Sequence, residues 1–148
     1  MEQNKEINPK GVYNSRLINA SPEKVFSAFA EAKHLQNWWG PKGFKNTFYE
    51  FNFIIGGVWD FVMHSPDGTD YKNKCVFLEI TKPNKIVIEH IPPPHFVLTV
   101  TLEEENGKTR INWEQVFDSV EQRNSLADFI KNANEENFDR LESVIALI

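Results

Sequence analysis

Residues 58–64, which read VWDFVMH, decide the fold together with the segments around them, because apolar side chains recur there at every second position. This spacing is typical of a β-strand. Trp59, Phe61 and Met63 are expected to share one face of the strand, opposite Asp60 and His64. The sequence leaves open which of the two faces points inward.

Five further runs of the same kind predict a meander of antiparallel strands. They cover residues 44–53, 71–80, 86–91, 96–102 and 110–117. The breaks between the runs have turn sequences such as Gly56-Gly57 and Asn106-Gly107. Strands joined by such short turns are antiparallel neighbours in a sheet.

The first part of the chain predicts one strand and two short helices. Residues 12–20 alternate as a strand, and Ser21-Pro22 then starts a helix, since serine caps helices and proline suits the first turn. Apolar side chains follow at helical spacing, at Val25, Phe26, Phe29 and Ala32. Residues 34–39 are expected to form a second short helical turn, which Gly40-Pro41 ends.

Residues 119–148 predict one long C-terminal helix, because they contain neither glycine nor proline. Ser119 stands three residues before Gln122, which is the spacing of a capping box. The apolar side chains expected to face the sheet are Phe129, Ile130, Ala133, Leu141, Val144, Ile145 and Ile148. Those expected in solvent are Asp128, Lys131, Glu135, Asp139 and Glu142. Asn137 interrupts the apolar stripe, so its side chain either caps one end of the cavity or turns toward the surface, and we expect the surface.

Together these elements predict an α+β fold. A seven-stranded, curved antiparallel sheet surrounds the C-terminal helix, and two short helices lie between the first two strands. We expect residues 1–11 to form a flexible N-terminal segment and residues 12–148 to form a single domain. A chain of 148 residues has the usual size of one domain. Because a strongly curved sheet cannot lie flat along a helix, a cavity is expected between them.

The composition favours a protein that binds a small molecule. Aromatic residues make up 13% of the chain, and such rings often line ligand cavities. The net charge of -5, without a basic cluster, argues against a nucleic-acid partner. The chain has neither a secretory signal nor an apolar run that could span a membrane, so a cytoplasmic protein without membrane insertion is expected. Cys75 is expected to be a packing residue.

Three groups of motifs resemble one known family. They are Pro22-Glu23-Lys24-Val25-Phe26 with Trp38-Trp39-Gly40-Pro41, then Gly56-Gly57-Val58-Trp59 with residues 62–71, and Phe138-Asp139-Arg140-Leu141. The combination is similar to the heat-shock-protein-90 ATPase activator homologue family, from about Val12 to the end of the chain. That family belongs to the START-like superfamily, which includes the birch pollen allergen and the polyketide cyclases. The resemblance implies the helix-grip fold, which is the arrangement derived above.

The resemblance also implies a cavity that binds hydrophobic molecules, although only some branches of the superfamily are enzymes. It supplies no catalytic residues. Stimulation of a chaperone is not expected, because the activator's separate N-terminal domain has no counterpart in 148 residues. Two departures from the family bear on the cavity: Ile54-Ile55 replaces the Arg-Pro of many members, and Asn137 stands near a glycine of many members.

The residues expected to line the cavity are aromatic, apolar or titratable. They are Trp38, Trp39, Trp59, Phe61, Met63, His64, His95, Trp113, Phe129 and Ala133. His64, His90 and His95 are also candidates for acid–base chemistry, since histidine titrates near neutral pH. None of them lies in a nucleophile or metal motif, and the chain has no phosphate loop. No metal and no cofactor are therefore expected.

The leading hypothesis is a domain that binds a small hydrophobic or amphipathic molecule. The first alternative is an enzyme of the polyketide cyclase or hydrolase type, in which a histidine or carboxylate in the cavity acts as general acid or base. The second alternative is a module that interacts with a chaperone. The sequence leaves open the identity of the ligand and whether the chain forms a homodimer.

Overall fold

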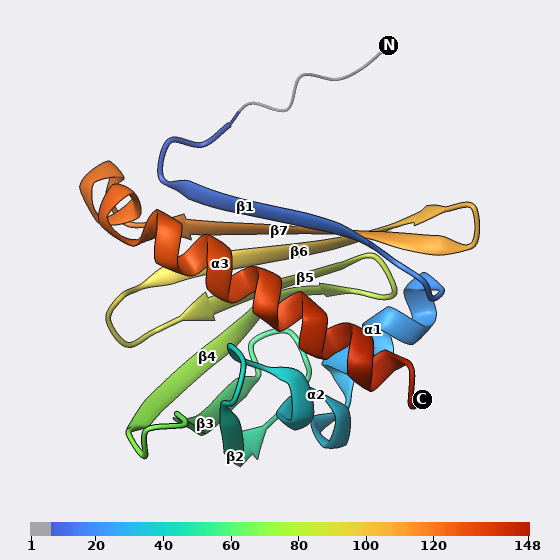
Figure 1. The fold of residues 1–148 in the computed structure, drawn as a ribbon, viewed down its shortest axis with the longest axis horizontal. Coiled ribbons are helices and arrows are strands. Elements are labelled where there is room, and N and C mark those ends of the chain that lie inside the picture. Colours follow the sequence, from blue (N-terminus) through green and yellow to red (C-terminus); the bar gives the residue numbers. More distant parts are fainter. Residues whose placement is uncertain (1–6) are drawn as a thin grey trace.

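The structure is a computed structural model, and it describes residues 7–148. The elements follow the predicted order, and Figure 1 shows them: β1 (Gly11–Ile18), α1 (Pro22–Ala30), α2 (Ala32–Trp38), β2 (Lys45–Phe51), β3 (Val58–His64), β4 (Asp70–Thr81), β5 (Lys85–His90), β6 (Phe96–Glu105), β7 (Lys108–Phe117) and α3 (Val120–Ile145). The predicted fold class is confirmed. Residues 1–6, which belong to the segment predicted to be flexible, lie outside the described residues.

The seven strands form one antiparallel sheet in the order β1-β7-β6-β5-β4-β3-β2. Every pair except β1 and β7 joins consecutive strands. β1 returns to pair with the last strand, so that Gly11 stands opposite Val116 and Ile18 opposite Thr109. The sheet bends around α3, which crosses its concave face (Figure 1). Register shifts in β2 and β4 accompany this curvature.

The starts of α1 and α3 are those that the sequence predicts, whereas α2 begins at Ala32, two residues before the predicted start. The Ser21 hydroxyl accepts a hydrogen bond from the Lys24 N–H at 3.3 Å, and Pro22 is the first residue of α1. The Ser119 hydroxyl accepts one from the Gln122 N–H at 3.1 Å at the start of α3. Each cap satisfies a backbone donor that has no partner inside its own helix.

The face of α3 that packs on the sheet agrees with the predicted one at Leu141 and Ile145 but differs from it elsewhere. The buried side chains are Ala127, Asn134, Asn137, Phe138, Leu141 and Ile145. Phe129 is 70% exposed, so the prediction that it lines the cavity is wrong. The physical reason is its phase: nine residues separate Phe129 from the buried Phe138, and at about 100° per residue they lie on opposite sides of the helix. Asn134 and Asn137 belong to the buried face, and the apolar pattern does not include them because they are polar.

Asn137 is buried, contrary to the prediction that it lies at the surface. Its side chain is only 6% exposed, and its Oδ1 accepts a hydrogen bond from the Gly40 N–H at 3.1 Å. The asparagine therefore ties α3 to the segment after α2. Ile54 and Ile55, the other departure from the family pattern, are 57% and 64% exposed in the β2–β3 connection. That departure changes the surface of the molecule.

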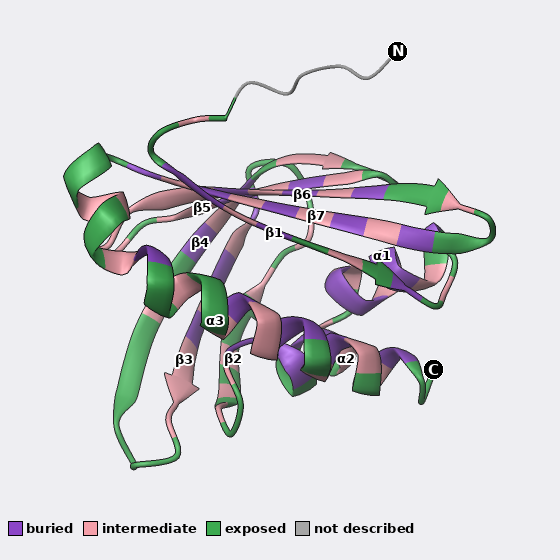
Figure 2. Cartoon of the chain, turned by 45° about the horizontal axis from the view of Figure 1, so that its top comes forward, coloured by how far each residue is buried: buried purple, intermediate pink, exposed green. Residues whose placement is uncertain are grey.

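The core has two apolar parts. Figure 2 shows buried residues concentrated where α1, α2 and α3 face the sheet. The main part is rich in aromatic rings and includes Phe138 and Leu141 of α3. The smaller part joins Val12, Phe117 and Ala127 near the start of α3. Between them along the helix lie buried polar side chains, so α3 meets the sheet through chemically different stretches.

Candidate ligand-binding site

Four tryptophans from three parts of the chain meet in the main core. Trp38 ends α2 and Trp39 caps it, while Trp59 comes from β3 and Trp113 from β7. The ring centroid of Trp39 lies 5.0 Å from that of Trp59 and 5.7 Å from that of Trp113. Trp39 thus packs against both sheet tryptophans at once. It is also the most exposed of the four, at 9%.

The space in which a cavity was expected is filled by these side chains in this structure. Phe61 stacks on Trp59 with centroids 4.2 Å apart, and Met63 packs against the same cluster. Trp59, Phe61 and Met63 therefore form the inward face of β3. Ala133 is only partly buried on α3. The four tryptophans predicted to line the cavity lie in one cluster, and side chains fill the space between them.

The four indoles differ in their hydrogen bonding. The Trp38 Nε1–H donates to the carbonyl of Ala28 at 2.9 Å. The Trp59 and Trp113 Nε1 atoms are buried and have no acceptor among residues 7–148. The carbonyl oxygen of the Asn46 side chain is also buried without a partner, while its Nδ2–H donates to the carbonyl of Trp39 at 2.8 Å. Unpaired polar groups therefore concentrate around Trp39.

The segment after Trp39 is held in a fixed shape. Gly40 has φ +102°, a backbone conformation that favours glycine, and Cε of Met63 lies 2.7 Å from the place that a Cβ atom would take. Arg140 of α3 donates from one terminal nitrogen to the carbonyls of Trp39, Gly40 and Pro41 at 2.9–3.2 Å. The loop backbone is fixed, whereas the Trp39 indole makes no hydrogen bond with the described residues.

Arg140 joins α3 to the segment around Trp39, although it was not among the predicted site residues. Its second terminal nitrogen donates to the carbonyls of Asn37 and Phe44 at 3.2 and 2.8 Å. It makes no ion pair with any carboxylate of the described chain, and burial lowers the pKa of its guanidinium. The available signal was its place in the motif Phe138-Asp139-Arg140-Leu141.

The histidines predicted at the cavity lie elsewhere. His64 is on the opposite face of β3 from Trp59, where its Nε2 lies 2.8 Å from the Thr47 hydroxyl and its Nδ1 lies 2.7 Å from Asp70. The alternation of the strand puts it outside. The prediction that it lines the cavity is therefore wrong.

His95 also faces away from the interior, so its assignment to the cavity is wrong as well. Its Nδ1 lies 2.7 Å from Asp118 and its Nε2 lies 2.8 Å from Glu89. Hydrogen bonds to Glu89 and then to Asp118 raise the pKa of the imidazole. Because both ring nitrogens of His95 are already paired with carboxylates, neither is free to exchange a proton with a bound molecule.

Cys75 is buried in the main core. Burial raises the pKa of its thiol to about 12, so the thiol stays protonated at neutral pH. Its packing and its chemistry agree with the structural role that the sequence predicts.

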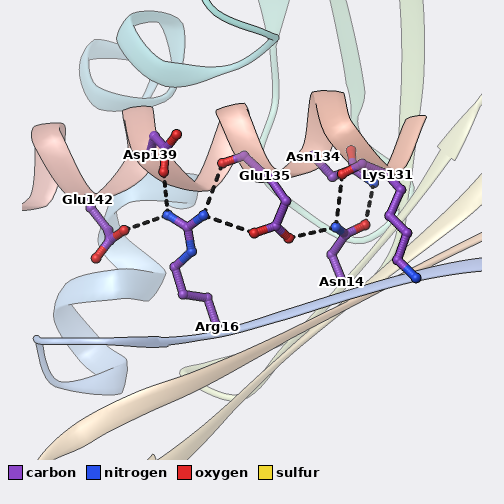
Figure 3. A network of polar contacts seen from close by, with 7 residues as sticks. All are labelled: Asn14, Arg16, Lys131, Asn134, Glu135, Asp139 and Glu142. Atoms are coloured by element: carbon purple, nitrogen blue, oxygen red, sulfur yellow. Dashed lines mark hydrogen bonds and ion pairs between the residues drawn. The ribbon is translucent and has the colours of Figure 1, made fainter. Parts of the chain in front are cut away.

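A polar network joins β1 to the middle of α3, as Figure 3 shows. Arg16 pairs with three carboxylates of the helix, Glu135 at 3.0 Å, Asp139 at 2.7 Å and Glu142 at 2.6 Å. Next to it, Asn14 and Asn134 are buried and bonded to each other at 3.1 Å. The three carboxylates were expected in solvent, and their side chains are 43–69% exposed, but each also pairs with Arg16 of β1.

Two hollows open on the outside of the described chain. One, of about 490 Å³, lies between α2 and the C-terminal end of α3 and is lined by His34, Asn37, Arg140, Ser143, Val144, Leu147 and Ile148. The other, of about 200 Å³, lies over β1, β7 and β6 and includes Tyr13, Thr99 and Glu114. Both are separate from the tryptophan cluster, apart from a contribution of Trp113 to the smaller one.

Comparison with known families gives a match over most of this fold. The model of the family "Activator of Hsp90 ATPase homolog 1-like protein" matches residues 19–146. The chain belongs to this family. The matched residues include both short helices, the four tryptophans and Arg140. No curated protein matches the sequence.

Solved structures have the same fold as this member of the family, at low sequence identity. A protein from Arthrobacter aurescens, solved by NMR, has a TM-score of 0.87 at 22% identity, covering 98% of this chain and 91% of that one. A crystal structure from Nitrosomonas europaea has a TM-score of 0.87 at 18% identity, with 97% and 99% covered. A protein from Mycobacterium smegmatis has a TM-score of 0.83 at 16% identity, with 99% and 98% covered. Among the described residues, no helix is long and apolar enough to cross a membrane.

Proposed function

We propose that the protein binds a small, mainly apolar molecule that carries a hydrogen-bond acceptor, in the tryptophan cluster between the sheet and α3. The observation that carries the proposal is the pair of buried indole N–H groups of Trp59 and Trp113, which have no acceptor in the described chain. A buried donor left unpaired costs about 1–3 kcal/mol. A ligand oxygen that accepts from one of them would recover that cost.

Trp39 is the side chain that would make room for the ligand. It contacts both sheet tryptophans, and its ring is the most exposed of the four. Its backbone is held by Asn46 and Arg140, so rotation of the side chain alone opens the space without moving the loop. Binding would then depend on a rotamer change of one residue. The fold family commonly binds hydrophobic ligands, which supports the same site.

No observation favours the enzyme alternative. His64 and His95 are directed away from the tryptophan cluster and paired with carboxylates outside it. General acid–base chemistry needs a titratable group within hydrogen-bond reach of the bound molecule. The arrangement around Trp39 supplies indole donors and the Asn46 amide, which hold a ligand rather than transfer protons.

The test compares two neutral ligands of one shape, 2-acetylnaphthalene, which has a carbonyl acceptor, and 2-ethylnaphthalene, which has none. We expect the ketone to bind about tenfold more tightly by titration calorimetry, because only the ketone pairs an indole donor. The double variant Trp59→Phe, Trp113→Phe keeps the rings but removes both donors, and we expect it to lose this preference.

The matched control is Trp38→Phe, which removes an indole donor that is already paired with Ala28. We expect this variant to be less stable but to keep the preference for the ketone. If neither naphthalene binds, or if the double variant keeps the preference, the proposal is wrong. Native mass spectrometry of freshly purified protein would then show which molecules, if any, are retained.

A further inference from the structure

The hollow between α2 and α3 combines features that the tryptophan cluster lacks. Its volume of about 490 Å³ falls in the range of small-molecule sites, about 300–1,000 Å³. Figure 1 shows α2 beside the C-terminal part of α3, and the two helices are in contact. Polar side chains, Asn37 and Ser143 among them, line part of this hollow, and Leu147 and Ile148 line another part. Its lining is therefore amphipathic.

Arg140 gives this hollow a positive charge that no side chain neutralises. Both terminal nitrogens are engaged by neutral carbonyls, and no carboxylate of the described chain pairs with the guanidinium. Its Nε–H makes no hydrogen bond with the described residues. A charge-assisted hydrogen bond from this donor is open to an anionic group of a ligand.

The other charges near the hollow are weaker. His34 lies 3.6 Å from Glu31, and Glu31 lies 3.6 Å from Lys33, so these groups largely offset one another. The C-terminal end of α3 carries about half a negative charge and so opposes an anion. Its last carbonyls are partly engaged, since Val144 and Ile145 accept from Leu147 and Ile148 at 3.0 and 3.2 Å. Arg140 is the one arginine or lysine in this lining, which contains no aspartate or glutamate side chain.

The apolar part of the lining fits a hydrocarbon chain. Leu147 is 88% exposed and Ile148 is 42% exposed, and Val144 beside them is partly buried. Covering these side chains removes apolar surface from water at about 25 cal/mol per Å². A ligand with a charged head and an apolar tail would therefore use both parts of the lining.

We infer that the hollow between α2 and α3 is a second ligand site, which binds a small amphipathic anion such as an alkyl carboxylate. The head group accepts from the Arg140 Nε–H and from the Asn37 amide, whose other hydrogen already goes to the carbonyl of Lys33 at 2.9 Å. The tail lies against Val144, Leu147 and Ile148. The site is independent of the tryptophan cluster, because it takes a charged ligand from the outside of the helices.

The test measures three ligands with one tail and different head groups, decanoate, decanol and decyltrimethylammonium, by titration calorimetry below their micelle concentrations. We expect decanoate to bind at least about tenfold more tightly than decanol, and the ammonium to bind more weakly than either. If decanol equals decanoate, or if the ammonium binds most tightly, the inference is overturned.

A matched pair of variants locates the site. Ser143→Asp adds a negative charge to the lining, and we expect it to weaken decanoate binding at least about tenfold. Ser125→Asp is the control: both serines are exposed on α3, and both hydroxyls donate to a carbonyl of the preceding turn, at 3.1 and 2.9 Å. Ser125 is absent from the lining, so its variant should bind normally. Equal affinities in the two variants would contradict the site.

A second control separates this inference from the proposed function. The double variant Trp59→Phe, Trp113→Phe should bind decanoate as the unaltered protein does, while it loses the preference for the naphthyl ketone. Conversely, Ser143→Asp should leave ketone binding unchanged. If decanoate binding falls with the tryptophans and not with Ser143, decanoate uses the tryptophan cluster, and the second site is rejected.

Discussion

Arg16 and Arg140 both join α3 to the rest of the fold, but their surroundings differ in charge. Arg16 lies among Glu135, Asp139 and Glu142 of the helix. Burial opposes its charge, yet the hydrogen bonds that it donates to the three carboxylates raise its pKa. Arg140 lies among neutral carbonyls, and burial lowers its pKa. The contact of α3 with β1 therefore depends on opposite charges. Its contact with the segment around Trp39 depends on the directional hydrogen bonds of one side chain, Arg140.

The same difference separates two histidines of the β5–β6 region. His95 lies between Glu89 and Asp118, and these carboxylates raise its pKa. His90 stacks on Phe96 and faces the carbonyl of Pro94 at 2.9 Å and the side-chain oxygen of Asn73, and burial lowers its pKa. Groups ringed by carboxylates depend on charge, so salt and pH should affect them. Groups that pair with neutral oxygens gain no such attraction, and burial opposes their charged form.

The largest effect is expected for Arg140→Ala. The change leaves the carbonyls of Trp39, Gly40, Pro41 and Phe44 without this donor in a half-buried junction. We expect a loss of about 3 kcal/mol in the free energy of unfolding, measured by urea denaturation. Arg140→Lys keeps the charge but cannot reach both sides of the junction, so it should lose most of the same stability. Full stability of the lysine variant would show that charge, rather than geometry, is what matters at this position.

A smaller effect is expected for Arg16→Met. Its partners are partly exposed, with side chains of Asp139 and Glu142 reaching solvent, so their ion pairs are screened. We expect a loss of about 1 kcal/mol at low salt, and Arg16→Lys should recover most of it.

Salt distinguishes the two arginines. The stability difference between Arg16→Met and the unaltered protein should shrink in 1 M sodium chloride, to about half its low-salt value or less. The difference for Arg140→Ala should stay nearly constant, because neutral carbonyls are its partners. If salt reduces the stability losses of both variants equally, the two arginines do not differ in how they hold α3.

The sequence predicted the elements that depend on local periodicity and missed those that depend on distant polar pairing. Alternation in β3 placed Trp59 and Phe61 on a common face, and the structure buries that face. On α3, the apolar period placed Leu141 and Ile145 correctly. It missed Asn134 and Asn137, which find partners on other elements and can therefore be buried. Periodicity counts such residues as exposed.

The candidate site shows the same limit. The tryptophans could be assigned to one interior from their positions in the strands and helices, but whether a void remains between four rings depends on their rotamers. The role of Arg140 was hidden, since its acceptors are backbone carbonyls about a hundred residues away in the chain. Any residue type has such a carbonyl, so the motif Phe138-Asp139-Arg140-Leu141 could draw attention to Arg140 but could not indicate its partners.

The smallest effect is expected from the histidine pair, as a dependence on pH. The ordinary histidine pKa is 6.5, and that of His95 is raised in the folded protein, so His95 stabilises the fold fully below pH 6.5 and loses this effect as the pH rises through its raised pKa. His95→Gln should therefore differ most from the unaltered protein at mildly acid pH and least at alkaline pH, in urea denaturation repeated from pH 5 to pH 9.

His90→Gln should show the opposite slope. The pKa of His90 is lowered by burial, so its neutral form stabilises the fold above pH 6.5, and this contribution falls as the pH drops through the lowered pKa. The stability that the variant lacks relative to the unaltered protein should then be greatest near neutral pH and shrink in acid. If the stability effects of the two variants change with pH in opposite directions, the carboxylates around His95, and not the shared β5–β6 connection, determine the direction of the pH dependence. Parallel slopes would mean that both histidines respond to one common opening of this region.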